Sequence, residues 1–122
     1  MPNLNTRRVQ ELLPLPLPVF HMLLALADGD RHGYALKREI LQRSHGKLNL
    51  GSGALYGSIN KMLEQGLIEE SGDRPDPHLD DERRRYYRIT PLGQLAAQAE
   101  AARLRELVQL AEDSLGALAD HA

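Results

Sequence analysis

A chain of 122 residues is most simply one domain with a modest hydrophobic core. Only five residues are aromatic and none is cysteine, which favours a helical core of Leu, Ile, Val, Ala and Met and excludes disulfides and thiolate metal sites. The net charge of −2 argues against a uniformly basic nucleic-acid binder, and no apolar stretch is long and unbroken enough to span a bilayer. We therefore expect a soluble, cytoplasmic protein without membrane contact.

The charge is unevenly distributed along the chain. Residues 31–61 contain six basic residues against one acidic residue, whereas residues 91–122 contain two basic against five acidic. A basic middle segment suits an anionic partner. The alternative, that these charges form ordinary solvated faces, stays open on composition alone.

The first part of the chain predicts two short helices after an N-terminal segment. Residues 1–14 include RRVQELL, which can form one or two helical turns, and the LPLP that follows is extended because proline disfavours helix in the residue before it. Pro18 suits the first position of a helix that continues over 19–27 and ends at DGD. RHGYALKREILQRSHG has apolar residues near helical spacing and is expected to end at Gly46.

A third helix begins in the small-residue cluster GSGALYGS. Leu55, Ile59 and Met62 repeat at helical spacing and predict its buried face. Ser52 is the predicted N-cap, and Gly66 stands where a left-handed C-terminal cap belongs.

The second half predicts a hairpin and a long helix. LIEES and RRYYRIT are strand candidates joined by the charged GDRPDPHLDDER. Thr90 and Pro91 then form a helix start, and the helix is expected to run from Leu92 to about Ala119. The order predicts a mainly α fold of the α+β class, a winged helix-turn-helix followed by a long C-terminal helix.

The glycine cluster at 51–57 also permits a nucleotide-binding interpretation. A phosphate-binding glycine loop must follow a buried parallel strand, but GKLNL is short and half polar. Small residues at a helix tip instead let the backbone approach DNA phosphates, with the helix N-terminal amides directed at them. We therefore favour DNA as the anionic partner.

Four residues of the third helix are predicted to contact DNA. Ser52 and Ala54 lie at its tip, and Lys61 lies on its exposed face. Tyr56 falls off the apolar stripe, so its hydroxyl could bond a phosphate or its ring could touch a thymine methyl. The alternative is a tyrosine that covers the edge of the core. The hairpin adds three adjacent arginines at a strand entrance, Arg83, Arg84 and Arg85.

Catalytic and metal sites find little support in the sequence. The five histidines lack the close two-histidine pairing of common zinc motifs, and a solvated loop is a better interpretation of 76–81 than a cation site. Ser52 has no G-x-S-x-G setting. We expect no enzyme activity, no metal and no cofactor.

Three ordered motifs resemble the PadR family of transcriptional regulators. They are HGYALKREI, GALYGSINKMLEQGLIEE and RRRYYRITPLG, and the match covers about residues 15–93. The resemblance implies a winged-helix DNA-binding domain at 15–90 and a dimerisation helix at 91–122, with 1–14 aiding the dimer interface. The apolar stripe that would join two subunits contains Leu104, Leu107, Val108, Ala111 and Leu115.

The family resemblance also implies a function. Members are transcriptional regulators, so we expect a repressor that binds double-stranded DNA as a homodimer on a pseudo-palindromic operator. Some members bind phenolic acids or planar drugs, in certain cases between aromatic side chains at the dimer interface. This chain has no Trp and no aromatic residue in its last helix, so we do not expect an aromatic-sandwich site, and a small-molecule effector, if there is one, is of unknown identity. The sequence departs from the family pattern at Ala54 and Gly57, where a hydroxyl residue and a proline are usual. The net charge and the acidic hairpin motivate an alternative, a winged-helix protein-interaction module with little DNA affinity.

Overall fold

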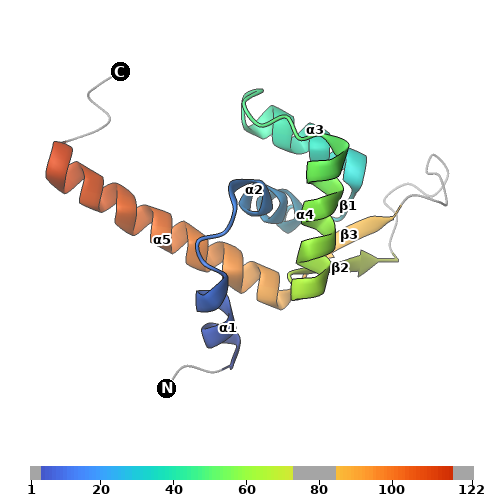
Figure 1. Ribbon diagram of the computed structural model, residues 1–122, viewed down its shortest axis with the longest axis horizontal. Helices are drawn as coiled ribbons and strands as arrows, with labels where there is room; N and C mark the ends of the chain where they lie inside the picture. Colours follow the sequence, from blue (N-terminus) through green and yellow to red (C-terminus); the bar gives the residue numbers. More distant parts are fainter. Residues whose placement is uncertain (1–3, 73–84, 117–122) are drawn as a thin grey trace.

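The computed structural model of the chain describes residues 4–72 and 85–116, and its elements confirm the predicted order with one added strand (Figure 1). The helices are α1 (Leu4–Leu12), α2 (Leu17–Ala27), α3 (Gly33–Arg43), α4 (Ser52–Gln65) and α5 (Pro91–Leu115). The strands are β1 (Arg31–His32), β2 (Ile68–Ser71) and β3 (Tyr86–Ile89). The mainly helical α+β class and the winged helix-turn-helix are confirmed.

The strands form one antiparallel sheet in the order β1-β3-β2. The predicted pairing of β2 with β3 is confirmed, with Ile68 opposite Ile89. Strand β1 was not predicted, because two residues are too few to show an alternating pattern. Arg31 pairs with Tyr87, so the start of α3 is tied directly to the central strand of the sheet.

Helix α2 lies at the centre and contacts α3, α4, α5 and β3. Its Met22 and Leu23 are fully buried, because VFHMLLALA is apolar on nearly every side. The predicted stripe of α4 is buried as well, at Leu55, Ile59 and Met62. These side chains form one core, which fixes α4 with its opposite side turned outward.

The structure corrects two helix ends near the candidate site. The N-cap of α4 is Gly51, not Ser52, and no side chain caps this end. Helix α3 ends at Arg43, before the expected stop at Gly46. The left-handed cap at Gly66 is confirmed, with φ +76° and ψ +15°.

Helix α5 begins as predicted, because the Thr90 hydroxyl accepts a hydrogen bond from the Gly93 N–H at 3.0 Å and Pro91 follows it. A Cβ atom at Gly93 would overlap the carbonyl oxygen of Leu67 and lie 2.8 Å from Ile89 Cγ1. The helix therefore rests directly on backbone that follows α4. It ends at Leu115, earlier than the expected Ala119, and residue 119 lies outside the described residues.

Helix α1 confirms the expected helical turns of the N-terminal segment and packs against α5. The Arg8 side chain donates a hydrogen bond to the Gln65 carbonyl at 2.7 Å. The buried Glu100 carboxylate accepts the Leu15 N–H at 3.3 Å and two bonds from Arg103, each 2.8 Å. These contacts tie the N-terminal segment to both α4 and α5.

Candidate nucleic-acid interface

The outward face of α4 is built from small and polar side chains. It lies opposite the buried stripe, and helix geometry gives it a spacing of four, three and four residues. Its members are all exposed, Gly53, Gly57, Asn60 and Glu64. Asn60 was not among the predicted contacts, although its spacing from Gly57 could have identified it. Its amide can bond an adenine edge bidentately.

The N-terminal end of α4 is open. No side chain caps it, and a Cβ atom added at Gly51 or Gly53 would meet nothing within 4 Å. Ser52 and Ala54 are both exposed at this tip, where they were predicted to lie. The first amides of the helix are therefore accessible to an anion such as a DNA phosphate.

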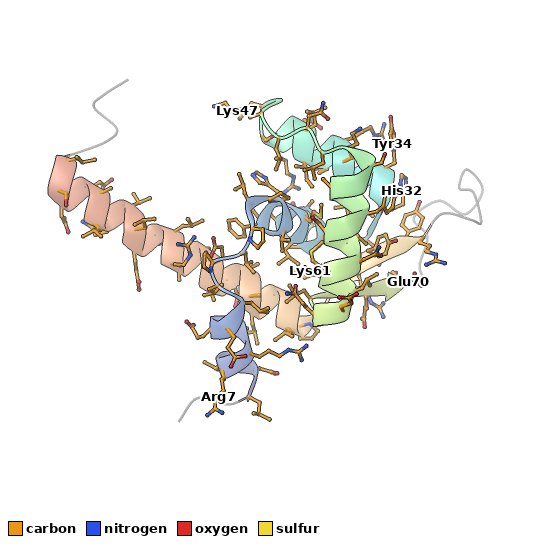
Figure 2. The ribbon with its side chains drawn as sticks, viewed as in Figure 1. Arg7, His32, Tyr34, Lys47, Lys61 and Glu70 are labelled. Carbon is orange, nitrogen blue, oxygen red and sulfur yellow. The ribbon has the colours of Figure 1, made fainter. Side chains whose placement is uncertain are left out.

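Lys61 and Tyr56 lie on opposite flanks of the outward face. Lys61 is exposed and makes no ion pair with another described residue (Figure 2). Tyr56 is 47% exposed, and its ring covers Gly33 at the start of α3. The predicted contact residues of α4 are thus brought together, with Tyr56 also packed against a neighbouring helix.

Helix α3 and the loop after it add further cations. Lys37, Arg38 and Lys47 have no acidic partner among the described residues, and Arg38 lies 5.2 Å from the centre of the Tyr34 ring. Figure 2 shows Tyr34 and Lys47 at the end of the molecule formed by α3.

Two arginines of the same basic segment are neutralised within the fold. Arg43 is paired with Asp28 and with Glu39, the latter at 3.0 Å, and Arg31 lies 3.9 Å from Glu39. The Arg43 guanidinium lowers the pKa of the Asp28 carboxyl by hydrogen bonding. The positive charge available to a partner therefore comes mainly from the lysines and Arg38.

The wing offers less free charge than its sequence indicates. Arg85 forms an ion pair with Glu70 at 3.2 Å, and Arg88 forms one with Glu69 at 2.8 Å. All four side chains are exposed, so each pair is weak. Arg83 and Arg84, with the hairpin tip at 73–82, lie outside the described residues.

Tyr86 and Tyr87 anchor the central strand on both sides. Both are buried, although successive side chains of a strand point to opposite faces. Tyr86 meets the His32 ring edge-on at 5.3 Å. Burial raises the pKa of Tyr87, with further contributions from Glu70 and Tyr56 and an opposing one from Arg85. Tyr87 lies opposite Arg31 of β1 and Glu70 of β2, so the two outer strands meet the central strand at this residue.

The predicted dimerisation stripe lies on the half of α5 that extends away from the rest of the fold (Figure 1). Leu107, Val108 and Leu115 are 52%, 48% and 72% exposed. Leu104 and Ala111 are partly buried. Rows of exposed apolar side chains are typical of surfaces that contact another molecule, and the use of this row in dimerisation stays a prediction.

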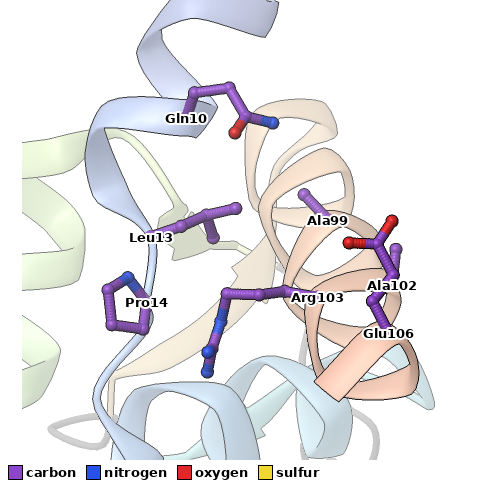
Figure 3. Close-up of a pocket in the computed structure, with 7 residues that line it drawn as sticks. All are labelled: Gln10, Leu13, Pro14, Ala99, Ala102, Arg103 and Glu106. Carbon is purple, nitrogen blue, oxygen red and sulfur yellow. The ribbon is translucent and has the colours of Figure 1, made fainter. Parts of the chain in front are cut away.

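A hollow of about 420 Å³ lies between α1 and α5 (Figure 3). It is lined by Gln10, Leu13, Pro14, Ala99, Ala102, Arg103 and Glu106. Within the described residues, no group of three or more His, Asp or Glu side chains could hold a metal ion. None of the helices over 4–72 and 85–116 is long and apolar enough to cross a membrane.

Comparison with known proteins begins with a family model, that of the transcriptional regulator PadR-like family, which matches residues 22–99. The chain is 36% identical over 83 residues to a 37.1 kDa protein in transposon TN4556 of Streptomyces fradiae, covering 66% of this chain but 21% of that protein. It is 29% identical over 98 residues to protein X of Lysinibacillus sphaericus, covering 77% and 86% respectively. The chain thus spans only about a fifth of the first relative.

Solved structures share the fold at low identity. A PadR family transcription regulator from Clostridium difficile R20291 has a TM-score of 0.68 at 20% identity, over 83% of this chain and 100% of that one. A transcriptional regulator from Clostridium thermocellum has 0.64 at 23%, over 80% and 88%. RosR from H. salinarum has 0.60 at 23%, over 87% and 99%. At these identities the likeness establishes the fold alone.

Proposed function

The chain belongs to the PadR-like family of transcriptional regulators, and on this premise we propose that it is a repressor that binds a pseudo-palindromic DNA operator as a homodimer. The observation that carries the proposal is the outward face of α4. This face combines a helix N-terminus without a side-chain cap with small side chains, and the exposed Lys61 lies on its flank. That combination suits close approach to a phosphate backbone and insertion into a major groove.

The candidate contact residues of α4 suit two kinds of DNA contact, with phosphates and with a base edge. Ser52, Ala54 and the open amides at the tip are suited to phosphates, and Lys61 supplies a charge on the same helix. Asn60 supplies the amide that can read a base edge. In the wing, Arg85 is the described candidate for a phosphate contact once it leaves Glu70. Arg83 and Arg84 remain predicted contacts.

The homodimer part of the proposal is supported by α5. Residues 91–115 form one continuous helix, and its exposed apolar stripe needs a partner surface. Full burial of a Leu or Val side chain is worth about 1.5–3 kcal/mol, so several such residues can hold two subunits together. A second copy would place its α4 about 34 Å away, one turn of DNA from the first. A small-molecule effector would act by changing this spacing, and the hollow between α1 and α5 borders the helix that sets it.

The test measures DNA binding as a function of salt. Wild-type protein should enrich a duplex from a random-sequence pool and bind it with an affinity that falls steeply as salt rises. Lys61→Ala should flatten the dependence of log K on log salt by about 0.9. Arg7→Ala, an exposed cation on α1, is the matched control and should leave the slope unchanged. An unchanged slope for Lys61→Ala would remove that residue from the interface.

A protein-interaction module is the second candidate, because the described wing arginines are paired with Glu69 and Glu70 and the net charge is −2. It is distinguished by the same experiment. Failure to enrich any duplex, with no salt-sensitive complex at micromolar protein, would favour this candidate over the repressor.

A further inference from the structure

Gly33 and Tyr56 form a contact that joins α3 to α4. A Cβ atom at Gly33 would lie 2.8 Å from Tyr56 Oη, 3.0 Å from Cε1 and 3.1 Å from Cζ. These distances are too short for ordinary packing, so a side chain at position 33 would require the hydroxyl end of the Tyr56 ring to shift. Gly33 is buried beneath it, whereas Tyr56 keeps 47% of its surface exposed.

The backbone gives no separate reason for glycine at this position. Gly33 is the first residue of α3, and its φ is not in the left-handed region that favours glycine. A helix position of this kind normally prefers a residue with a Cβ atom. The missing side chain at position 33 is therefore explained by the ring above it.

The Tyr56 side chain lies outside the buried stripe of α4. The buried stripe determines which side of α4 faces the core, and Tyr56 adds a contact with α3 outside that stripe. Tyr56 lies about 100° from Leu55 around the helix. On the other flank, Ala54 and Lys61 are exposed and offer no comparable packing. The ring is thus a contact, on one flank of α4, that influences the angle between α3 and α4.

We propose that Tyr56 is a positioning residue, whose ring, seated on Gly33 of α3, sets the angle at which α4 presents Asn60 and Lys61 to DNA. The inference rests on the proposed function for its DNA part and on geometry for the contact itself. In this proposal the ring of Tyr56, not its hydroxyl, positions α4. Gly33 then influences DNA recognition although it is buried.

The first test is a double-mutant cycle in thermal or urea unfolding, which needs no DNA. With Tyr56 present, Gly33→Ala should destabilise the fold, because either the ring leaves its seat or the helix shifts. With Tyr56→Ala the same change should be neutral or stabilising, since alanine suits a helix better than glycine. The coupling should change the unfolding equilibrium constant by at least about fivefold. Gly53→Ala, which adds a methyl group in open space, is the control and should combine additively with Tyr56→Ala.

The second test separates positioning from a direct contact and from a merely structural role. The probe is the duplex enriched by the wild type, compared with a shuffled duplex of equal length. Gly33→Ala and Tyr56→Ala should each lower the ratio of the two affinities by about tenfold, the scale of a lost base contact, with the salt slope unchanged. Tyr56→Phe keeps the ring and should retain the wild-type ratio.

The results distinguish a failure of the positioning proposal from a failure of the proposed function. An additive unfolding cycle overturns the contact, and a Tyr56→Phe loss equal to that of Tyr56→Ala shows that the hydroxyl touches DNA and overturns positioning by the ring. Equal loss on both duplexes would mean a structural role only. A wild type that enriches no duplex refutes the proposed function instead, and it leaves the coupling between Gly33 and Tyr56 unaffected.

Discussion

Replacement of Gly93 by alanine should strongly destabilise the protein. Gly93 is buried in the first turn of α5, and the added methyl group would overlap the Leu67 carbonyl oxygen and lie 2.8 Å from Ile89 Cγ1. The Leu67 oxygen cannot move freely, because it also accepts the Thr90 N–H at 3.1 Å. The start of α5 must therefore move away from the backbone that follows α4.

The size of the effect follows from what this movement disrupts. Overpacking of this kind costs about 1–3 kcal/mol. Two hydrogen bonds of Thr90, to Leu67 and to the Gly66 carbonyl, contribute about 1 kcal/mol each if they are lost. Alanine returns about 0.5–1 kcal/mol through its better helix propensity. The net destabilisation should be about 3 kcal/mol, which lowers Tm by about 12 °C for a domain of this size.

Circular dichroism during heating measures this change, with all variants at one protein concentration because a dimer's Tm depends on concentration. Gly57→Ala is the matched control, since a Cβ atom there meets nothing within 4 Å. It should raise stability by about 0.5–1 kcal/mol. A Gly93→Ala variant that melts with the wild type would refute the claim that α5 rests on this backbone.

Three further predictions concern charge and assembly. Glu70→Gln releases Arg85 from its ion pair. The variant should bind the enriched duplex about two- to fivefold more tightly, with a steeper salt dependence, in fluorescence anisotropy measurements. Unchanged affinity would exclude Arg85 as a phosphate contact. Val108→Glu combined with Leu115→Glu should yield monomers in analytical ultracentrifugation, and a persisting dimer would place the interface elsewhere. The Glu100 pKa is lowered, chiefly by hydrogen bonds from Arg103, so its carboxylate stabilises the fold fully above the unfolded-state pKa of about 4.3 and loses this effect as the pH falls through the folded value. Glu100→Gln should therefore flatten the decline of Tm as the pH falls below about 5, and an undiminished decline would show that other groups cause it.

The sequence predicted those parts of the fold whose signals are local. The stripe of Leu55, Ile59 and Met62 identified α4, and the Thr90 cap and Gly66 marked helix ends correctly. Each of these features is determined by residues that lie close to it in the sequence. The exposed tip of α4 at Ser52 followed from the same local pattern.

Features that depend on distant partners could not be predicted. Strand β1 exists because β3 lies beside it, and residues 31–32 alone show no strand pattern. The pairing of Glu70 with Arg85 depends on the register of the hairpin, and the seating of Tyr56 on Gly33 depends on how α3 and α4 cross. Neither the register of the hairpin nor the way α3 and α4 cross can be predicted from a short stretch of sequence. The exposure of the predicted contact residues on α4 therefore followed from the sequence, and their contact with DNA stays a prediction, whereas the contacts that hold α4 in place emerged only from the structure.

The strand order β1-β3-β2 has a consequence for solubility. Because β3 is central, β2 is an outer strand, and its free edge could pair with a strand of another molecule. Glu69 and Glu70 are exposed on this strand, and charged side chains on an edge strand disfavour its pairing with another chain. The carboxylates that pair with Arg85 and Arg88 thus also act as gatekeepers against sheet extension and aggregation. Improving DNA affinity by removing both would expose the protein to that hazard.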